Sequence, residues 1–266
     1  MVDIHAHLLP GLDDGPTSTG EALRMCELYV AEGVSTVVAT PHQLDHRFNV
    51  PPVAVREAVD ELSDACGRRG LELEILPGGD VRLQPELLHA LEAREVLTLA
   101  DAGAYLLLEL PPLIAPHING LVFELALRGI TPVLSHPERN LELLRKPHRL
   151  AELVEHGCLV QITAGSLLGA FGRSARRAAE RFLKAGLVHV VATDAHAADG
   201  PRTPALKRAA DRLASLVGGQ TARSLLWENP KRIISTEGPE PEAATRPLAD
   251  EGATRASNAA PSERPG

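Results

Sequence analysis

The sequence predicts an α/β fold in which parallel strands alternate with helices and the sheet closes, or nearly closes, into a barrel. About seven short apolar runs are separated by stretches with apolar residues at helical spacing, and this alternation is typical of a parallel sheet. The run 104–110 is almost continuously apolar, as expected of a strand covered on both faces. The length of 266 residues is close to the roughly 250 residues of one α/β barrel, a fold that places its chemistry at the carboxyl ends of its strands.

The first half of the chain supplies four of the predicted strands. The first ends in Asp3-Ile4-His5-Ala6-His7, and residues two apart on a strand point to the same face, so His5 and His7 have the geometry of a chelating pair. At Pro77-Gly78-Gly79 the glycines permit a turn that presents Asp80. The remaining elements predicted in this half are helices at 20–32, 53–69 and 85–89, and strands at 35–40, 71–76 and 104–110.

The second half continues the alternation up to a change in composition. Its predicted elements are helices at 117–128, 150–156, 174–185, 204–216 and 222–227, and strands at 130–136, 158–163 and 188–194. Residues 237–266 are rich in Pro, Gly, Ala and charge, with Leu248 as the only large apolar residue. Such a segment buries too little surface to order itself. We therefore predict one domain, residues 1–236, followed by a disordered C-terminal tail, residues 237–266.

Charge and composition argue against nucleic acid as a partner. The formal net charge is −8, and four Phe, two Tyr and one Trp provide little for base stacking. Three widely spaced cysteines without CxxC spacing are typical of reduced thiols. No secretion signal is visible, and no apolar run approaches the roughly 18 residues of a membrane span. We expect a soluble cytoplasmic protein without direct membrane insertion, and the sequence gives no oligomeric state.

Polar residues able to bind a divalent metal follow most of the predicted strands. Five of the seven apolar runs end in such a residue, and a sixth carries Glu109 near its end. One histidine at a strand end is usually structural, but so many together indicate a metal site. Because several carboxylates accompany the imidazoles, more than one metal is expected, and the nitrogen and oxygen donors permit manganese, iron or zinc. The residues concerned are His5, His7, His42, Asp80, Glu109, His136, Asp194 and His196.

Three further residues lie close to these strand ends. Asp14 follows the first histidine pair and is either part of a solvated turn or an additional carboxylate ligand. Arg139 and Arg202 lie on loops after ligand-bearing strands. Each could be a surface ion-pair partner, but beside metals a planar guanidinium suits bidentate contact with a phosphate.

The assembled motifs resemble the polymerase-and-histidinol-phosphatase (PHP) superfamily, and within it the bacterial manganese-dependent tyrosine-protein phosphatases of the CpsB/YwqE type. The resemblance runs from Met1 to about Ser235. Its most specific parts are DIHAHLLPGLDDGP at the start, ATPH at 39–42, SHPERN at 135–140, QITAGSLLGAFG at 161–172 and ATDAH at 192–196. It implies a distorted (β/α)7 barrel with a trinuclear metal centre at the carboxyl ends of the strands.

The resemblance also implies roles for these residues. Two closely spaced metals would be served by His5, His7, Asp80, Glu109, His136 and Asp194, and a third by Asp14, His42 and His196. Arg139 and Arg202 would hold the substrate phosphate. A metal-bound water, His42 or His196 could assist departure of the phenolate, and the sequence does not choose among them. One departure concerns Asp80, where the family usually has Glu, in GGD instead of GQE. Asp is one methylene shorter, so we expect the site to bind metal with altered occupancy.

The implied reaction is hydrolysis of phosphotyrosine on a protein by a manganese-activated water, with an autophosphorylating bacterial tyrosine kinase that controls capsule or exopolysaccharide production as the partner. Cysteine-dependent tyrosine phosphatases have Arg six positions after the catalytic Cys, but here Glu32, Glu72 and Ala164 occupy that offset, which excludes a thiol mechanism. Two alternatives stay open. One is a small-molecule phosphatase of the histidinol phosphatase kind, and the other is a noncatalytic, metal-stabilised kinase-binding module.

Overall fold

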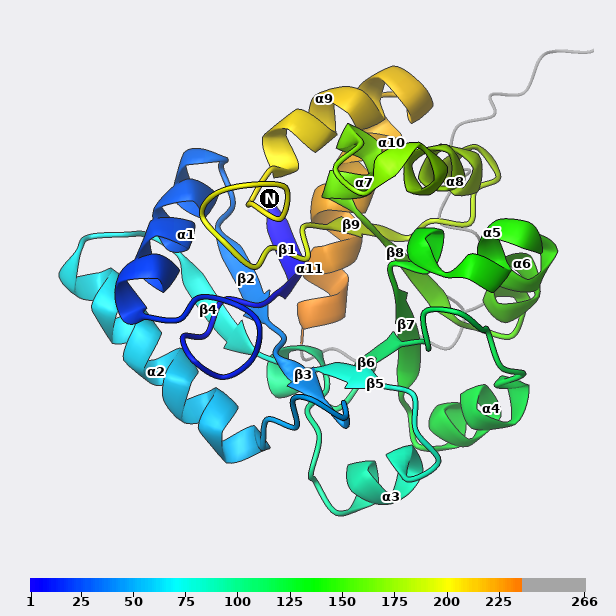
Figure 1. Cartoon of the computed structure of the whole chain (residues 1–266), viewed down its shortest axis with the longest axis horizontal. Coiled ribbons are helices and arrows are strands. Elements are labelled where there is room, and N and C mark those ends of the chain that lie inside the picture. The colour runs from blue at the N-terminus through cyan, green and yellow to red at the C-terminus, as the bar shows by residue number, and fades with distance from the viewer. Residues whose placement is uncertain (236–266) are drawn as a thin grey trace, which may run out of the picture.

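Parallel strands occupy the centre of the molecule and helices surround them (Figure 1). The computed structural model describes residues 1–235, so the predicted tail at 237–266 lies outside the described residues. All strand pairs among residues 1–235 are parallel. The strands are β1 (Val2–Ala6), β2 (Thr36–Ala39), β3 (His42–Gln43), β4 (Glu74–Pro77), β5 (Asp80–Arg82), β6 (Tyr105–Glu109), β7 (Thr131–Ser135), β8 (Leu159–Thr163) and β9 (Val190–Ala192).

Helices lie between most successive strands, and the last three helices of residues 1–235 follow β9 (Figure 1). They are α1 (Thr19–Ala31), α2 (Pro52–Arg68), α3 (Leu87–Glu92), α4 (Asn119–Leu127), α5 (Leu141–Arg145), α6 (His148–Glu155), α7 (Ala164–Leu168), α8 (Gly172–Lys184), α9 (Leu206–Val217), α10 (Gly219–Arg223) and α11 (Asn229–Ile234). Single turns form η1 (Leu99–Asp101) and η2 (Pro137–Arg139), and a π-helical turn forms η3 (Ser224–Glu228). None of the helices within residues 1–235 has the length and apolar character needed to cross a bilayer.

The strands of residues 1–235 form two hydrogen-bonded sheets, so their ladders do not show the closed barrel that the sequence predicts. One sheet has the order β1-β2-β4 and the other β3-β5-β6-β7-β8-β9. β2 and β4 belong to the first sheet, whereas β3 and β5, which closely follow them in the chain, belong to the second. Pro41, which has no N–H to contribute to a ladder, lies between β2 and β3. Only an isolated bridge between Ala6 and Ala195 joins β1 to the chain after β9. The α/β class and the parallel sheet agree with the prediction.

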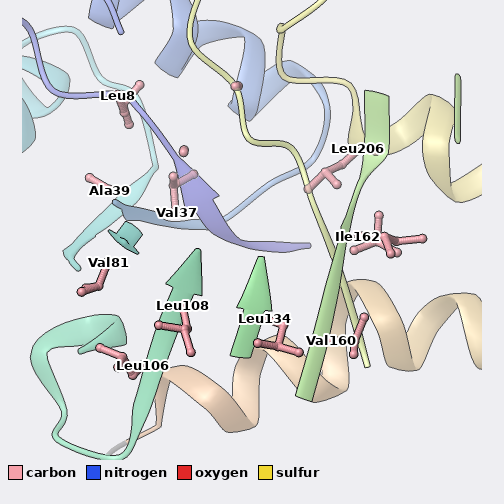
Figure 2. Packing of buried hydrophobic residues seen from close by; sticks show 14 of the residues in the cluster. Leu8, Val37, Ala39, Val81, Leu106, Leu108, Leu134, Val160, Ile162 and Leu206 are labelled. Atoms are coloured by element: carbon pink, nitrogen blue, oxygen red, sulfur yellow. The ribbon is translucent and has the colours of Figure 1, made fainter. Parts of the chain in front are cut away.

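Both faces of the strands are buried, which explains their uniformly apolar sequences. On β7, Val133 belongs to an inner cluster and its neighbour Leu134 to the outer core beneath the helices. Figure 2 shows part of this outer core, with Leu106 and Leu108 of β6 beside Leu134. Ile233 of α11 packs into the inner cluster. The strands are therefore fixed from both sides, and their carboxyl ends are rigid supports for a site.

Some elements differ from the sequence-based expectation. The strand predicted at 71–76 begins only at Glu74 and continues to Pro77. The short strands β3 and β5 were not predicted, and neither were the helices α5, α7 and α11. The helix predicted at 222–227 overlaps the end of α10 and most of the π-helical turn η3. Two or three residues are too few to show a periodic pattern, which is why β3 and β5 escape detection.

Candidate metal centre and substrate cleft

All nine residues predicted as metal ligands lie together at the carboxyl ends of the strands. They form four overlapping sets, and within each set one ligand atom per residue lies within 4.8 Å of the others. The sets are His7, Asp14, His42 and His196; His5, His7 and Asp80; His5, His136 and Asp194; and His42, Asp80 and Glu109. Because four residues occur in two sets each, neighbouring cations in these positions would share ligands.

The histidine pair at the end of β1 points into this cluster. The Nε2 atoms of His5 and His7 lie 3.4 Å apart, and both side chains are fully buried. The Nδ1 atom of His5 lies 2.9 Å from Oε1 of Gln161, and Nδ1 of His7 lies 2.6 Å from Oδ2 of Asp13. When Nδ1 donates to these oxygens, the Nε2 lone pair of each ring is left free to face the centre.

His42 and Asp80 lie side by side because they are register partners in the pairing of β3 with β5. The Nδ1 atom of His42 lies 3.5 Å from Oδ2 of Asp80 and 3.8 Å from Oε2 of Glu109. These three buried atoms have no hydrogen-bond partner among residues 1–235. Such atoms are costly to bury without a partner. A bound cation would satisfy all three, so the donor set fits a metal.

Two residues after strand ends adopt a left-handed backbone conformation that is uncommon outside glycine. His136 has φ 36° and Asp194 has φ 52°. Strained positions of this kind cluster at functional sites. Asp194 is central, because its Oδ1 lies 3.3 Å from Nε2 of His5 and its Oδ2 accepts a 2.5 Å hydrogen bond from Nη2 of Arg139. His196 lies at the outer side, with Nε2 3.2 Å from Oδ1 of Asp14.

The electrostatics of the cluster favour the deprotonated forms of His7, His136 and Asp194 but the protonated forms of Glu109 and His42. Although burial opposes it, Asp14 and Asp80 raise the pKa of His42 to about 11. Burial, assisted by the charge of His196, lowers the pKa of His7 to about 4. Burial and the nearby Arg139 hold the pKa of His136 well below its usual range. Although burial opposes it, Arg139 and His5 hold the pKa of Asp194 well below its usual value. Burial and the charge of Asp80 raise the pKa of Glu109 to about 8. This crowding of carboxylates would be relieved by cations.

The cluster forms part of the lining of a cleft of about 370 Å³. Arg139 and Arg202, the two arginines predicted from sequence, line the same cleft. Nη2 of Arg202 lies 3.3 Å from Oδ1 of Asp194, and Nη2 also contacts Nε2 of His196. The Nε atoms of both arginines are buried and have no hydrogen-bond partner among residues 1–235. Both guanidinium groups therefore have donors left for an anion in the cleft.

Sequence reasoning missed several side chains that support the site. Arg82 lines the cleft and lies 3.1 Å from Oε2 of Glu109 and 2.9 Å from Oδ2 of Asp45. Arg82 could have been predicted from the sequence, because a residue two positions after Asp80 on a strand points to the same face. Asp13 and Gln161 orient the first histidine pair. Gln161 lies within the strand predicted at 158–163, and an amide is not a typical ligand for a transition metal.

Asp3, the first residue of the DxHxH motif, supports the fold and is not one of the candidate metal ligands. It is fully buried and belongs to none of the four sets. Its Oδ1 accepts hydrogen bonds from the backbone N–H groups of His5 and Thr193, and its Oδ2 accepts from the hydroxyl groups of Tyr29 and Thr193. This carboxyl group therefore ties β1 to the chain after β9, beside the isolated bridge.

Comparisons with known proteins give one consistent result. The family described as capsular polysaccharide synthesis, CpsB/CapC, matches residues 1–235. Tyrosine-protein phosphatase YwqE of Bacillus subtilis is 40% identical over 197 residues, which cover 74% of this chain and 77% of the relative. Tyrosine-protein phosphatase CpsB of Streptococcus pneumoniae is 31% identical over 240 residues, covering 88% of this chain and 98% of the relative.

A solved structure is also similar. It was reported with the crystal structures of YwqE from Bacillus subtilis and CpsB from Streptococcus pneumoniae, described as unique metal-dependent tyrosine phosphatases. It superposes with a TM-score of 0.83 at 36% identity and covers 88% of this chain and 94% of that chain. The similarity therefore extends over nearly all of the described residues.

Proposed function

Because this chain belongs to the CpsB/CapC family of capsular polysaccharide synthesis proteins, we propose that it is a metal-dependent tyrosine-protein phosphatase. One observation carries the proposal for this chain itself. Nine nitrogen and oxygen donors converge beside two arginines whose Nε atoms are without partners, along one cleft. A cluster of cation ligands next to free guanidinium donors suits a phosphate monoester.

The centre holds three manganese ions in this proposal. His5, His7, Asp80, Glu109, His136 and Asp194 hold two of them, and Asp14, His42 and His196 hold the third. Four overlapping donor sets support neighbouring cations that share ligands. When bound, divalent cations supply Lewis acidity, which neutralises charge on phosphate oxygens and makes water a stronger nucleophile at neutral pH.

The residues of the chain then act by binding and orienting the substrate. Arg139 and Arg202, which line the cleft, hold the phosphate through their guanidinium groups in this proposal. Gln161 and Asp13 keep the rings of His5 and His7 in place. A phenolate leaves readily because the pKa of a tyrosine hydroxyl is about 10, so a phosphotyrosine substrate needs little protonation, which His42 or His196 provides in this proposal.

The substrate we propose is a phosphotyrosine segment of an autophosphorylating bacterial tyrosine kinase, in the control of capsule or exopolysaccharide production. The family description supports a role in capsular polysaccharide synthesis. The cysteines take no part, since Cys26, Cys66 and Cys158 are all buried.

Phosphate release from a phosphotyrosine peptide tests the proposal. We expect turnover with manganese, loss of turnover with excess chelator, recovery on adding manganese back, and resistance to thiol alkylation. His136→Ala should lose both activity and bound manganese. His148→Ala removes an exposed imidazole from α6 and should change neither.

Two outcomes would overturn the proposal. Faster hydrolysis of histidinol phosphate than of the peptide would indicate a small-molecule phosphatase. Binding of a kinase tail without any phosphate release in manganese would indicate a noncatalytic binding module.

A further inference from the structure

Arg139, which lines the cleft, lies over an aromatic ring. Its Cζ atom lies 4.6 Å from the centroid of the Phe171 ring, a distance typical of a cation–π contact. At its other end, Nη2 donates to Oδ2 of Asp194. The guanidinium group is therefore fixed at two points, while Nε has no hydrogen-bond partner among the described residues.

The backbone conformation around Phe171 fixes the position of this ring. Gly169 and Gly172 have φ values of 87° and 86°, which L side chains rarely adopt. Between them, the N–H of Ala170 donates to the carbonyl of Gly165 at 2.8 Å. The ring then lies directly over Gly165, where an added Cβ would be only 2.9 Å from Cε2 of Phe171. The glycine at 165 therefore leaves room for the ring.

The same segment also holds the residue before Arg139. Glu138 is fully buried, and its Oε1 accepts hydrogen bonds from the backbone N–H of Thr163 at 3.0 Å and from the hydroxyl of Ser166 at 2.7 Å. The loop that carries Arg139 is thus attached to the end of β8 and to α7. The motif at residues 161–172 contributes none of the nine candidate ligands, but it anchors two consecutive residues beside the cleft.

We propose that Phe171 is a positioning residue for phosphate binding, which sets the orientation of the Arg139 guanidinium through its ring face. The inference rests on the proposed function only in taking Arg139 as a phosphate-binding group. A leucine at 171 would fill space but has no π face, so Arg139 could rotate about its remaining contact with Asp194. The phosphate would then be bound less tightly in both ground and transition states, which raises KM and leaves kcat nearly unchanged.

Calorimetric titration of the manganese-loaded protein with inorganic phosphate measures this effect without any turnover. We expect Phe171→Leu to raise the Kd for phosphate about tenfold, in line with the strength of a desolvated cation–π contact. KM for a phosphotyrosine peptide should rise by a similar factor, with bound manganese and Tm unchanged. Phe171→Tyr keeps the ring and should behave like the wild type. Phe123→Leu, at an exposed position on α4, is the matched control.

A double-mutant cycle separates positioning from general damage. Gly165→Ala alone should displace the ring and raise the phosphate Kd as Phe171→Leu does. In the Phe171→Leu background, Gly165→Ala should add little, because the Cε2 atom that it would meet is already gone.

Three results would overturn the inference: an unchanged phosphate Kd in Phe171→Leu, a loss confined to kcat, or a loss accompanied by depleted manganese. A wild type that binds phosphate tightly but does not hydrolyse the phosphotyrosine peptide would refute the proposed function alone, since the phosphate titrations would still test Phe171.

Discussion

Asp3 offers a direct test of how β1 is joined to the chain after β9. Within residues 1–235 one isolated bridge pairs their backbones, and of the four hydrogen bonds to the Asp3 carboxyl group the two from Thr193 run across this junction, while those from His5 and Tyr29 hold the carboxyl group in place. Each is worth about 0.5–1.5 kcal/mol net, and together they amount to about 2–6 kcal/mol. Asp3→Ala would also leave the buried Tyr29 hydroxyl with one partner fewer.

We expect Asp3→Ala to lower the free energy of unfolding by about 3–5 kcal/mol, a large fraction of the 5–15 kcal/mol of a typical domain. Asp3→Asn keeps an oxygen for the backbone donors, and the two hydroxyl groups can reorient, so its loss should be smaller, about 1–2 kcal/mol. Urea unfolding followed by circular dichroism measures both values. Chelator in every sample removes any contribution from metal binding at the neighbouring His5.

Asp60→Ala serves as the control, because Asp60 is exposed on α2 and its replacement should change stability by less than about 0.5 kcal/mol. A loss below about 1 kcal/mol in Asp3→Ala, comparable to this control, would refute the reasoning. It would mean that packing of the inner cluster alone holds β1 against the β9 side.

Three further predictions concern the site and the core. Asp80→Ala should retain less manganese per chain after gel filtration, because Oδ2 of Asp80 is a buried atom without a hydrogen-bond partner among residues 1–235 and is available to bind a cation. An unchanged metal content would count against a ligand role. Gln161→Leu should weaken manganese binding about 10–100-fold in chelator competition, because His5 loses its orienting acceptor, whereas Gln161→Glu should keep it. His189 accepts a hydrogen bond from the N–H of Val160, and burial lowers its pKa to about 4. In the unfolded chain this imidazole is protonated below about pH 6.5, but in the folded chain it is protonated only below about pH 4. The free energy of unfolding should therefore fall by about 2 kcal/mol between pH 7 and pH 5 because of this group. His189→Asn preserves the acceptor and should remove that part of the pH dependence in urea unfolding; an identical pH profile would contradict the assignment.

The position of the candidate ligands could be predicted because it follows from topology. Parallel strands share one direction, so residues that follow apolar runs must gather at one edge of the sheet. His136 and Asp194 are far apart in sequence, yet His136 directly follows β7, Asp194 lies two residues after β9, and both are in the same set with His5. That inference required only the residue at which each predicted strand ends, and it did not depend on how side chains pack.

Supporting residues could not be predicted in the same way, because their roles depend on packing between distant segments. Nothing near Phe171 in the sequence indicates that Arg139 lies over its ring. Pro230 reads as a helix breaker after the helix predicted at 222–227, but it lies in the first turn of α11, where proline is tolerated. That helix then delivers Ile233 to the inner cluster.

The departure at GGD, where the resembled family usually has GQE, involves packing as well as the length of the carboxylate side chain. An added Cβ at Gly79 would lie 2.1 Å from Oε1 of Gln43, so the Gln43 side chain occupies the space that a larger residue at 79 would need. Gln43 is fixed there, because it donates to the carbonyl of Val50 and accepts from the N–H of Leu97. Asp80, directly after this close contact, still places Oδ2 within 3.5 Å of Nδ1 of His42. Gln43 therefore fills the space beside Gly79, and Asp80 reaches His42 from the backbone that follows this close contact.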